Sequence, residues 1–241
     1  MREMLLSEYG KLKSIDTPVE GCWINITSPD SEDISFLKEM GVEEDFVYDS
    51  LDQEERARFE QDEDLVYIIT KLPYFDGEDK AVPYKTMTLG IAMKSGYFVT
   101  ISGFKSAILE DLIEGRVRDV STKKRNRLLL RIFDRGTVYY LRYLKEIRRL
   151  SNEIESELHR STRNKELVAM LNLEKSLVFF TTSLRSNELM YEKLKRAHIL
   201  TLYEEDEELF EDISIENRQA IEIANIYSDI LTGMMDAFAS V

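Results

Sequence analysis

The sequence is poor in the residues from which catalytic and metal centres are most often built. It contains one cysteine and two histidines, and it has no G-x-G-x-x-G, G-x-x-x-x-G-K-[ST] or G-x-S-x-G motif. This supply of ligands argues against a zinc site of Cys and His donors and against a His-based catalytic triad, so we expect no enzyme. Cys22 lies in an apolar run and is expected to be a buried thiol in a reducing compartment. His159 and His198 lie in charged helical stretches and are expected on the surface.

Proline and glycine are absent from a long part of the chain. All four prolines lie within the first 83 residues, and neither residue type occurs from Thr137 to Thr232. Because these residues interrupt regular structure more strongly than any others, their distribution indicates a change of architecture. We predict an α/β (α+β) layered domain with a mixed sheet over residues 1–120. Residues 121–241 are predicted to form a bundle of long helices that ends in a stalk helix.

The N-terminal part has the local signals of short strands joined by turns. CWINIT and DLVYIITKLPYF are β-branched and aromatic runs, and YKTMTLGIAMKSGYFVTISG is typical of two strands around a tight turn. We therefore expect four or five strands with short helices between them. The expected strands lie near 4–9, at 22–27, at 64–75 and twice within 84–103, with a helix from about 28 to 40.

The C-terminal part is predicted to hold three helices, at 121–160, 164–198 and about 206–241, because apolar residues recur there at spacings of three and four. A helix near 35 residues spans about 50 Å, which suits a stalk. The last helix has a 4-3 rhythm that indicates a seam for self-association, although an intramolecular bundle fits it about equally well. The seam comprises Ile213, Asn217, Ala220, Ala224, Tyr227, Leu231, Met234, Phe238 and Val241. A second row, Ile223, Ile226, Ile230 and Gly233, widens this face, so that one side is expected to meet other copies.

Acidic residues dominate the charge of the chain. Lys and Arg number 32 against 46 Asp and Glu, and a formal net charge of -14 argues against nucleic-acid binding. No window approaches the roughly 18 apolar residues of a membrane span, and the N-terminus is not a signal peptide, so the polypeptide itself is expected to be soluble and cytoplasmic. The densest acidic run, EEDEELFED (204–212), fits either a solvated helix start or a weak site for a divalent cation such as Mg²⁺.

Several segments together resemble the cytoplasmic part of the CorA family of magnesium channels. They are WINIT, DFVYDSLDQEERARFE, DEDLVYIITKLPYF, GYFVTIS and DILTGMMDAFASV, in this order. Within them, Glu55-Arg56-Ala57-Arg58-Phe59-Glu60 stands where the family has Q-R-P-K-hydrophobic-E, and it lacks the proline. The likeness covers essentially the whole chain. It implies the soluble portion of a longer cell-membrane protein, in which a G-M-N loop would follow Val241 and the subunits form a homopentamer.

The resemblance also implies cation sites. A regulatory divalent cation would lie between Asp49 of one subunit and Asp212 of the next. A second position in some members would add Asp134 and the residue at 48, but Tyr48 is not a carboxylate, which puts that site in doubt. Asp236 would face the cytoplasmic mouth of the pore. The regulatory ion is expected to be Mg²⁺, with Co²⁺, Ni²⁺ or Zn²⁺ as alternatives.

Three other interpretations remain open at this point. The first is a soluble helical scaffold or adaptor, which explains the helical periodicity but not why DILTGMMDAFASV lacks a helix stop signal. The second is the zinc-transporting branch of the same family, although the scarcity of His and Cys favours a hard cation. The third, a carboxylate-metal hydrolase, requires acids that converge in a cleft, and the sequence does not indicate one.

Overall fold

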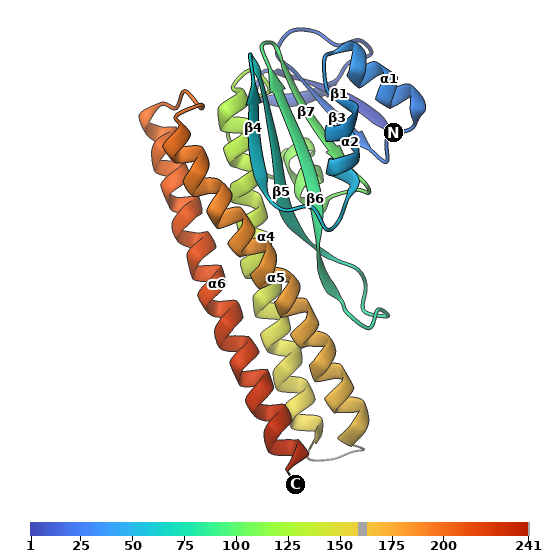
Figure 1. Ribbon diagram of the computed structural model, residues 1–241, viewed down its shortest axis with the longest axis vertical. Helices are drawn as coiled ribbons and strands as arrows, with labels where there is room; N and C mark the ends of the chain where they lie inside the picture. Colours follow the sequence, from blue (N-terminus) through green and yellow to red (C-terminus); the bar gives the residue numbers. More distant parts are fainter. Residues whose placement is uncertain (159–162, 241) are drawn as a thin grey trace.

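The computed structural model of the chain describes residues 1–158 and 163–240, so that His159 and Val241 lie outside it. A mixed sheet lies between two short helices on one face and the upper parts of the long helices on the other (Figure 1). The strands are β1 (Arg2–Glu8), β2 (Lys11–Ser14), β3 (Cys22–Thr27), β4 (Arg58–Asp62), β5 (Leu65–Phe75), β6 (Tyr84–Lys94) and β7 (Tyr97–Ser102). The helices are α1 (Ser31–Glu39), α2 (Glu44–Leu51), α3 (Ala107–Ile113), α4 (Arg125–Leu158), α5 (Arg163–Ala197) and α6 (Glu204–Ala239).

The sheet has the order β2-β1-β3-β7-β6-β5-β4. Only β3 and β7 pair in parallel, and every other neighbouring pair is antiparallel, which confirms the predicted mixed sheet. The expected strands are all present, but the prediction of four or five was too low, because β2 and β4 were missed. These two strands lie at the edges of the sheet and consist largely of exposed polar residues, so neither has the apolar alternation that marks a strand in a sequence.

The two faces of the sheet bury separate apolar clusters. On one face, α1 and α2 cover a cluster that includes Ile24, Phe46 and Ile69. On the other, α3 and the upper parts of the long helices cover a cluster that includes Trp23 and Phe133. Because both faces are covered, all six residues of β3 are buried, including Cys22 as expected. His198 is exposed, also as expected.

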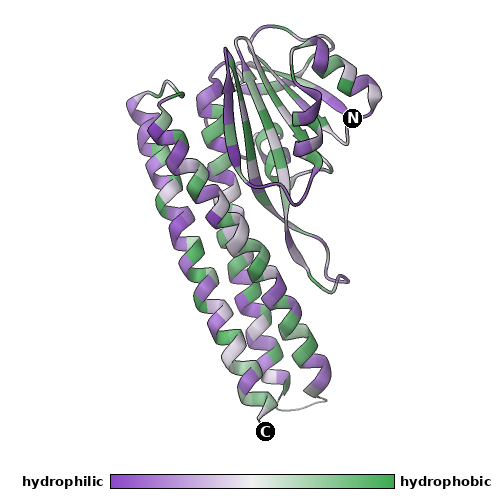
Figure 2. Cartoon of the chain, in the orientation of Figure 1, coloured by the Kyte–Doolittle hydropathy of each residue, from purple (hydrophilic) through white to green (hydrophobic). Residues whose placement is uncertain are grey.

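The three long helices lie side by side and extend well past the sheet, as predicted (Figure 1). Their lower halves share a third apolar cluster, in which Phe180 of α5 lies among side chains of α4 and α6. Hydrophobic and hydrophilic residues alternate along each helix, as Figure 2 shows. The division of the chain at residue 120 stays a prediction, since the cluster around Trp23 and Phe133 draws on residues from both sides of it.

The predicted self-association seam on the last helix is wrong for the residues that the structure describes. Ile213, Ala220, Ala224 and Leu231 are buried within the chain's own bundle, and Asn217 Nδ2 donates a hydrogen bond to the carbonyl oxygen of Leu184 on α5 at 3.0 Å. Tyr227, Met234 and Phe238 pack against the same cluster. A 4-3 rhythm shows that one face of a helix is covered, but it does not show which partner covers it.

Helix α5 corrects the expectation that no segment approaches a membrane span. Its segment Asn164–Ala197 is long and apolar enough to cross a membrane by length and composition. This indication is weak, because the core helix of a soluble protein passes the same test. Here Leu177 and Phe180 of α5 are fully buried in the bundle, whereas Val178 and Leu189 are exposed, so burial within the chain accounts for only part of its hydropathy.

Candidate cation-binding site

Helix α2 carries the first predicted site residue, Asp49. Phe46, Val47 and Ser50 are buried where the helix packs on β6 and β7. The opposite side of the helix faces solvent, and the side chain of Asp49 is 40% exposed. Strand β6 allows this close packing, because its Gly90 lies directly beneath Ser50. Asp49 is therefore held on a firmly packed helix with its carboxylate accessible to an ion.

Asp49 belongs to a small network of opposite charges. Nη2 of Arg58 donates to Oδ2 of Asp49 at 2.7 Å, Nε of Arg58 donates to Oε1 of Glu55 at 3.2 Å, and Nη1 contacts Glu60. Partial burial raises the pKa of Asp49; the Arg58 guanidinium opposes this, while Glu55, Asp45 and Glu60 add to it. The carboxylate is thus surrounded by more negative than positive charge, which favours a cation nearby.

The segment between Asp49 and Arg58 is fastened at several points. The buried ammonium of Lys71 donates to the carbonyl oxygen of Gln53 at 2.7 Å, and Thr88 Oγ1 donates to that of Asp52 at 2.7 Å. At the other end, the backbone N–H of Ala57 donates to Ser186 Oγ of α5 at 2.8 Å. These bonds fix the direction in which the chain enters β4, and Arg58 is its first residue.

The second predicted residue, Asp212, lies on the exposed side of α6 beside two further acids. Asp134 of α4 and Glu216 of α6 both have raised pKa values, caused first by burial. The negative charge of Asp212 raises both pKa values further, and that of Asp134 also raises the pKa of Glu216. The positive charges of Arg131 and Arg135 lower the pKa of Asp134 and so oppose its shift. Three carboxylates therefore gather where α4 faces α6.

Sequence reasoning missed Glu216, although its position was open to inference. It lies four residues after Asp212 on the same helix, and residues at this spacing share a helix face. The acidic run at the start of α6 has partners of its own. Asp206 is buried and accepts a hydrogen bond from Nε of Arg127 at 2.6 Å, and Glu211 accepts one from Nζ of Lys195 at 2.8 Å. These two acids of the run therefore have structural partners within the chain.

The structure does not bring Asp49 and Asp212 together within one chain. Helix α2 lies on one face of the sheet, whereas α6 packs mainly on α4 and α5 beyond the other face (Figure 1). Across the described residues, no group of three or more His, Cys, Asp or Glu side chains is placed to hold a metal ion. Tyr48, beside Asp49, donates its hydroxyl to Oε1 of Glu44 at 3.1 Å and supplies no carboxylate. The two predicted ligands thus lie apart within one chain, and their role stays a prediction.

The outward side of α6 is not covered by the rest of the described chain. Ile215 and Ile226 are 52% and 55% exposed there, although both are large apolar residues. Of the second row, Ile226 is exposed, and Ile223 and Ile230 are partly exposed. Asp236 is also exposed, near the end of the helix farthest from the sheet. Its predicted place at a pore mouth stays a prediction.

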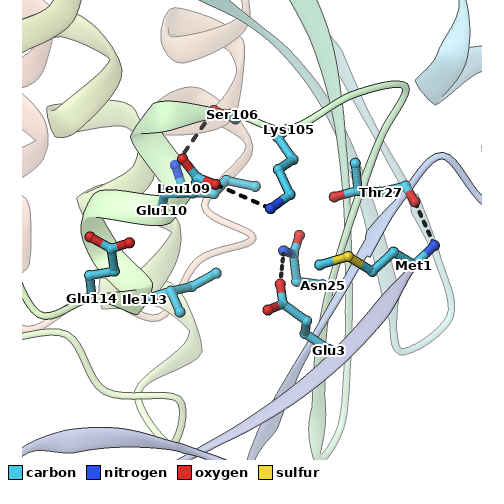
Figure 3. A pocket seen from close by; sticks show the side chains of 10 residues that line it. All are labelled: Met1, Glu3, Asn25, Thr27, Lys105, Ser106, Leu109, Glu110, Ile113 and Glu114. Carbon is cyan, nitrogen blue, oxygen red and sulfur yellow. Dashed lines mark hydrogen bonds and ion pairs between the residues drawn. The ribbon is translucent and has the colours of Figure 1, made fainter.

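A polar cavity of about 170 Å³ lies between β1, β3 and α3 (Figure 3). Three of its charged side chains have partners within it: Lys105 Nζ lies 3.7 Å from Oε1 of Glu110, and Asn25 Nδ2 donates to Oε2 of Glu3 at 3.2 Å. None of the predicted cation ligands lines it. The cavity is therefore separate from the candidate cation site.

Comparison with known proteins identifies the family. The sequence model of the CorA-like Mg²⁺ transporter protein matches residues 20–241. This chain belongs to the CorA family. It is 31% identical over 227 residues to the cobalt/magnesium transport protein CorA of Methanocaldococcus jannaschii. The aligned region covers 89% of this chain and 68% of that protein. CorA proteins are membrane transporters of divalent cations rather than enzymes, which agrees with the absence of catalytic motifs.

Solved structures agree with this assignment. The soluble domain of CorA from Methanocaldococcus jannaschii superposes with a TM-score of 0.84 at 28% identity, over 98% of this chain and 95% of that one. The complete CorA structure from the same organism gives a TM-score of 0.86 at 28% identity and covers all of this chain and 77% of that one. The cytoplasmic domain of ZntB from Vibrio parahaemolyticus shares the fold, with a TM-score of 0.78 at 13% identity. The predicted fold class is thereby confirmed.

Proposed function

We propose that this chain is the cytoplasmic regulatory domain of a CorA-like Mg²⁺ channel and senses intracellular divalent cations at carboxylate sites between subunits. The observation that carries the proposal is the separation of Asp49 and Asp212. Each is accessible to solvent, yet within one chain Asp49 lies on α2, over one face of the sheet, and Asp212 lies on α6, which packs on the long helices beyond the other face. An ion that needs both must therefore lie between two copies, with Asp49 from one and Asp212 from the next.

The donor set fits a hard cation. Mg²⁺ takes oxygen ligands and keeps several of its waters, so two carboxylates from separate subunits suffice for a weak site that responds to concentration. Asp134 and Glu216 surround Asp212 with further negative charge, which raises the local concentration of cations. The family transports divalent cations, and a domain that binds its cargo ion can report the internal concentration of that ion.

The mechanism follows as a shift between two populations. With cations bound, the paired carboxylates of neighbouring subunits hold a closed, symmetric homopentamer together. Without them, Asp49 and Asp212 repel each other, and each subunit carries a formal net charge of -14, so the subunits separate and the pore opens. The cation shifts the equilibrium only by the difference in its affinity for the two arrangements.

Neutralising both acids tests this mechanism. In the transporter of which this chain is proposed to be the cytoplasmic part, Asp49→Asn with Asp212→Asn should leave ion flux open at Mg²⁺ concentrations that close the parent. Glu39→Gln with Glu208→Gln is the matched control, because both acids are exposed, neither is a predicted ligand, and the pair of substitutions removes the same charge. Unchanged Mg²⁺ inhibition of flux in the site variant would refute the assignment.

Mixing single variants tests whether the site lies between subunits. Chains with Asp49→Asn retain Asp212, and chains with Asp212→Asn retain Asp49, so mixed assemblies contain some interfaces with both carboxylates. Mg²⁺-dependent association, measured by sedimentation velocity, should be weak for each variant alone and partly restored in the mixture. A mixture that associates no better than its components would argue for a site within one chain.

The same assay separates the alternative functions. Comparing Mg²⁺, Co²⁺, Ni²⁺ and Zn²⁺ shows which ion drives association at the lowest concentration, and a marked preference for Zn²⁺ would favour the zinc-transporting branch. A soluble scaffold or adaptor predicts association that none of these ions affects.

A further inference from the structure

Arg58 holds the position that a cation would take beside Asp49. Its guanidinium contacts three carboxylates, those of Asp49, Glu55 and Glu60, from three successive parts of the chain: helix α2, the connecting segment and strand β4. We infer that Arg58 is a tethered competitor of the regulatory cation at Asp49, and that it sets the cation concentration at which the site fills. The inference rests on the proposed function, since it concerns the threshold of that same site.

The competitor is held in place by the fold. Ala57, the residue before Arg58, is fastened to α5 through Ser186, and Gln53 is fastened to the buried ammonium of Lys71. Arg58 therefore starts from a fixed point of the backbone, and its guanidinium is present at Asp49 at a high effective concentration. Because a guanidinium keeps its proton throughout the physiological range, the competition does not depend on pH there.

The contacts to Glu55 and Glu60 allow the Arg58 guanidinium to be displaced from Asp49. When an ion takes the oxygen of Asp49 that now accepts from Nη2, the guanidinium keeps its partners Glu55 and Glu60. The displacement therefore exchanges one ion pair for a metal bond and leaves no cation without a partner. A partly exposed ion pair changes an equilibrium by about two- to five-fold, which sets the size of the expected effect.

Replacing the guanidinium by an amide of similar reach removes the competitor. Arg58→Gln should lower the Mg²⁺ concentration at half-maximal association of the chain by about two- to five-fold, as measured by sedimentation velocity. Arg56→Gln is the control, because Arg56 is exposed, lies two residues earlier and loses the same charge. The effect of Arg58→Gln should vanish in the Asp49→Asn background. An Arg58 that only stabilises the fold would give the opposite result, with a higher Mg²⁺ midpoint.

Binding of Mn²⁺ to the dilute, unassembled chain separates this inference from the proposed function. Mn²⁺ takes the same oxygen ligands and its free form is counted directly by electron paramagnetic resonance. Arg58→Gln should bind Mn²⁺ about two- to five-fold more tightly than either the wild-type chain or Arg56→Gln, and the gain should require Asp49. If the chain shows no Mg²⁺-dependent association but Arg58→Gln still binds Mn²⁺ more tightly, the proposed sensor function is refuted and the competition by Arg58 is not. Equal Mn²⁺ affinity of Arg58→Gln and Arg56→Gln would overturn the competitor.

Discussion

The contact between Gly90 and Ser50 allows α2 to be moved without changing any charge. A Cβ added at Gly90 would lie 1.8 Å from Oγ and 2.5 Å from Cβ of Ser50, far inside ordinary contact at 3.4 Å. Ser50 is fully buried and its hydroxyl donates to the carbonyl oxygen of Phe46 at 2.7 Å, so it cannot turn away freely. Strand β6 is paired on both sides, and α2 must therefore move outward by about 1.5 Å to restore ordinary contact.

We expect Gly90→Ala to lower the free energy of unfolding by about 1–3 kcal/mol, the usual cost of overpacking a core. Gly136→Ala is the matched control, because its Cβ would meet only the end of one side chain, Leu72, at 2.8 Å, and alanine is favoured over glycine within a helix by up to about 1 kcal/mol. The two substitutions add the same methyl group, but Gly136→Ala should cost less than Gly90→Ala. Urea unfolding followed by the fluorescence of the single, buried Trp23 measures both.

A second substitution tests whether Ser50 causes the loss. Ser50→Gly removes both colliding atoms, although glycine within a helix costs about 1 kcal/mol by itself. In the Gly90→Ala background, Ser50→Gly should therefore lower the free energy of unfolding by less than it does in the wild-type chain, or should raise it. The coupling energy between the two substitutions should be at least about 1 kcal/mol. Additive effects, or a Gly90→Ala chain as stable as Gly136→Ala, would refute the reasoning. The displaced α2 carries Asp49, so the Mg²⁺ response of Gly90→Ala should weaken as well.

Two further predictions concern buried ionisable groups. Burial raises the pKa of Asp111, but hydrogen bonds from Arg116, Arg135 and Tyr139 outweigh this effect, so the pKa is lowered overall. The contribution of the ionised Asp111 to stability is therefore present above about pH 3.8 and is lost as the pH falls through the lowered pKa. Asp111→Asn should cost about 3 kcal/mol at pH 7 in urea unfolding and should flatten the acid loss; an unchanged acid profile would contradict this. Burial raises the pKa of Tyr143 to about 12, so its contribution is full below pH 10 and is lost between pH 10 and 12. Tyr143→Phe should reduce the alkaline fall in the urea midpoint, and an equal fall in both proteins would count against the assignment.

The fold was largely predictable because its strongest signals are local. The absence of Gly and Pro from 137 to 232 marks the long helices, and the apolar run at 64–75 marks the long strand β5. The edge strand β4 was not predictable in this way, because it pairs on one side only and its Gln61 and Asp62 are exposed. Its pairing with β5 is a tertiary property that the composition of the segment does not carry.

The candidate site was less accessible to sequence reasoning. Asp49 and Asp212 came from the resemblance alone, since isolated acids in a chain with 46 of them have no signal of their own. The contact of Arg58 with Asp49 depends on how the segment between them turns, and the bonds from Lys71 and Ser186 that fix the turn come from residues remote in sequence. Long-range hydrogen bonds of this kind produce no periodic pattern in the sequence from which they could be predicted.

The inward packing of α6 also determines which of its residues remain for other copies of the chain. Ile213 and Asn217 are fixed in the intramolecular core, and successive residues of a helix are 100° apart, so Asp212 and Ile215 must project to the outside. In the proposed assembly the heptad would therefore act indirectly, because it sets the rotation of the helix rather than forming the contact between copies. A polar substitution on the inner row is then expected to turn Asp212 away from the proposed partner even with every carboxylate in place.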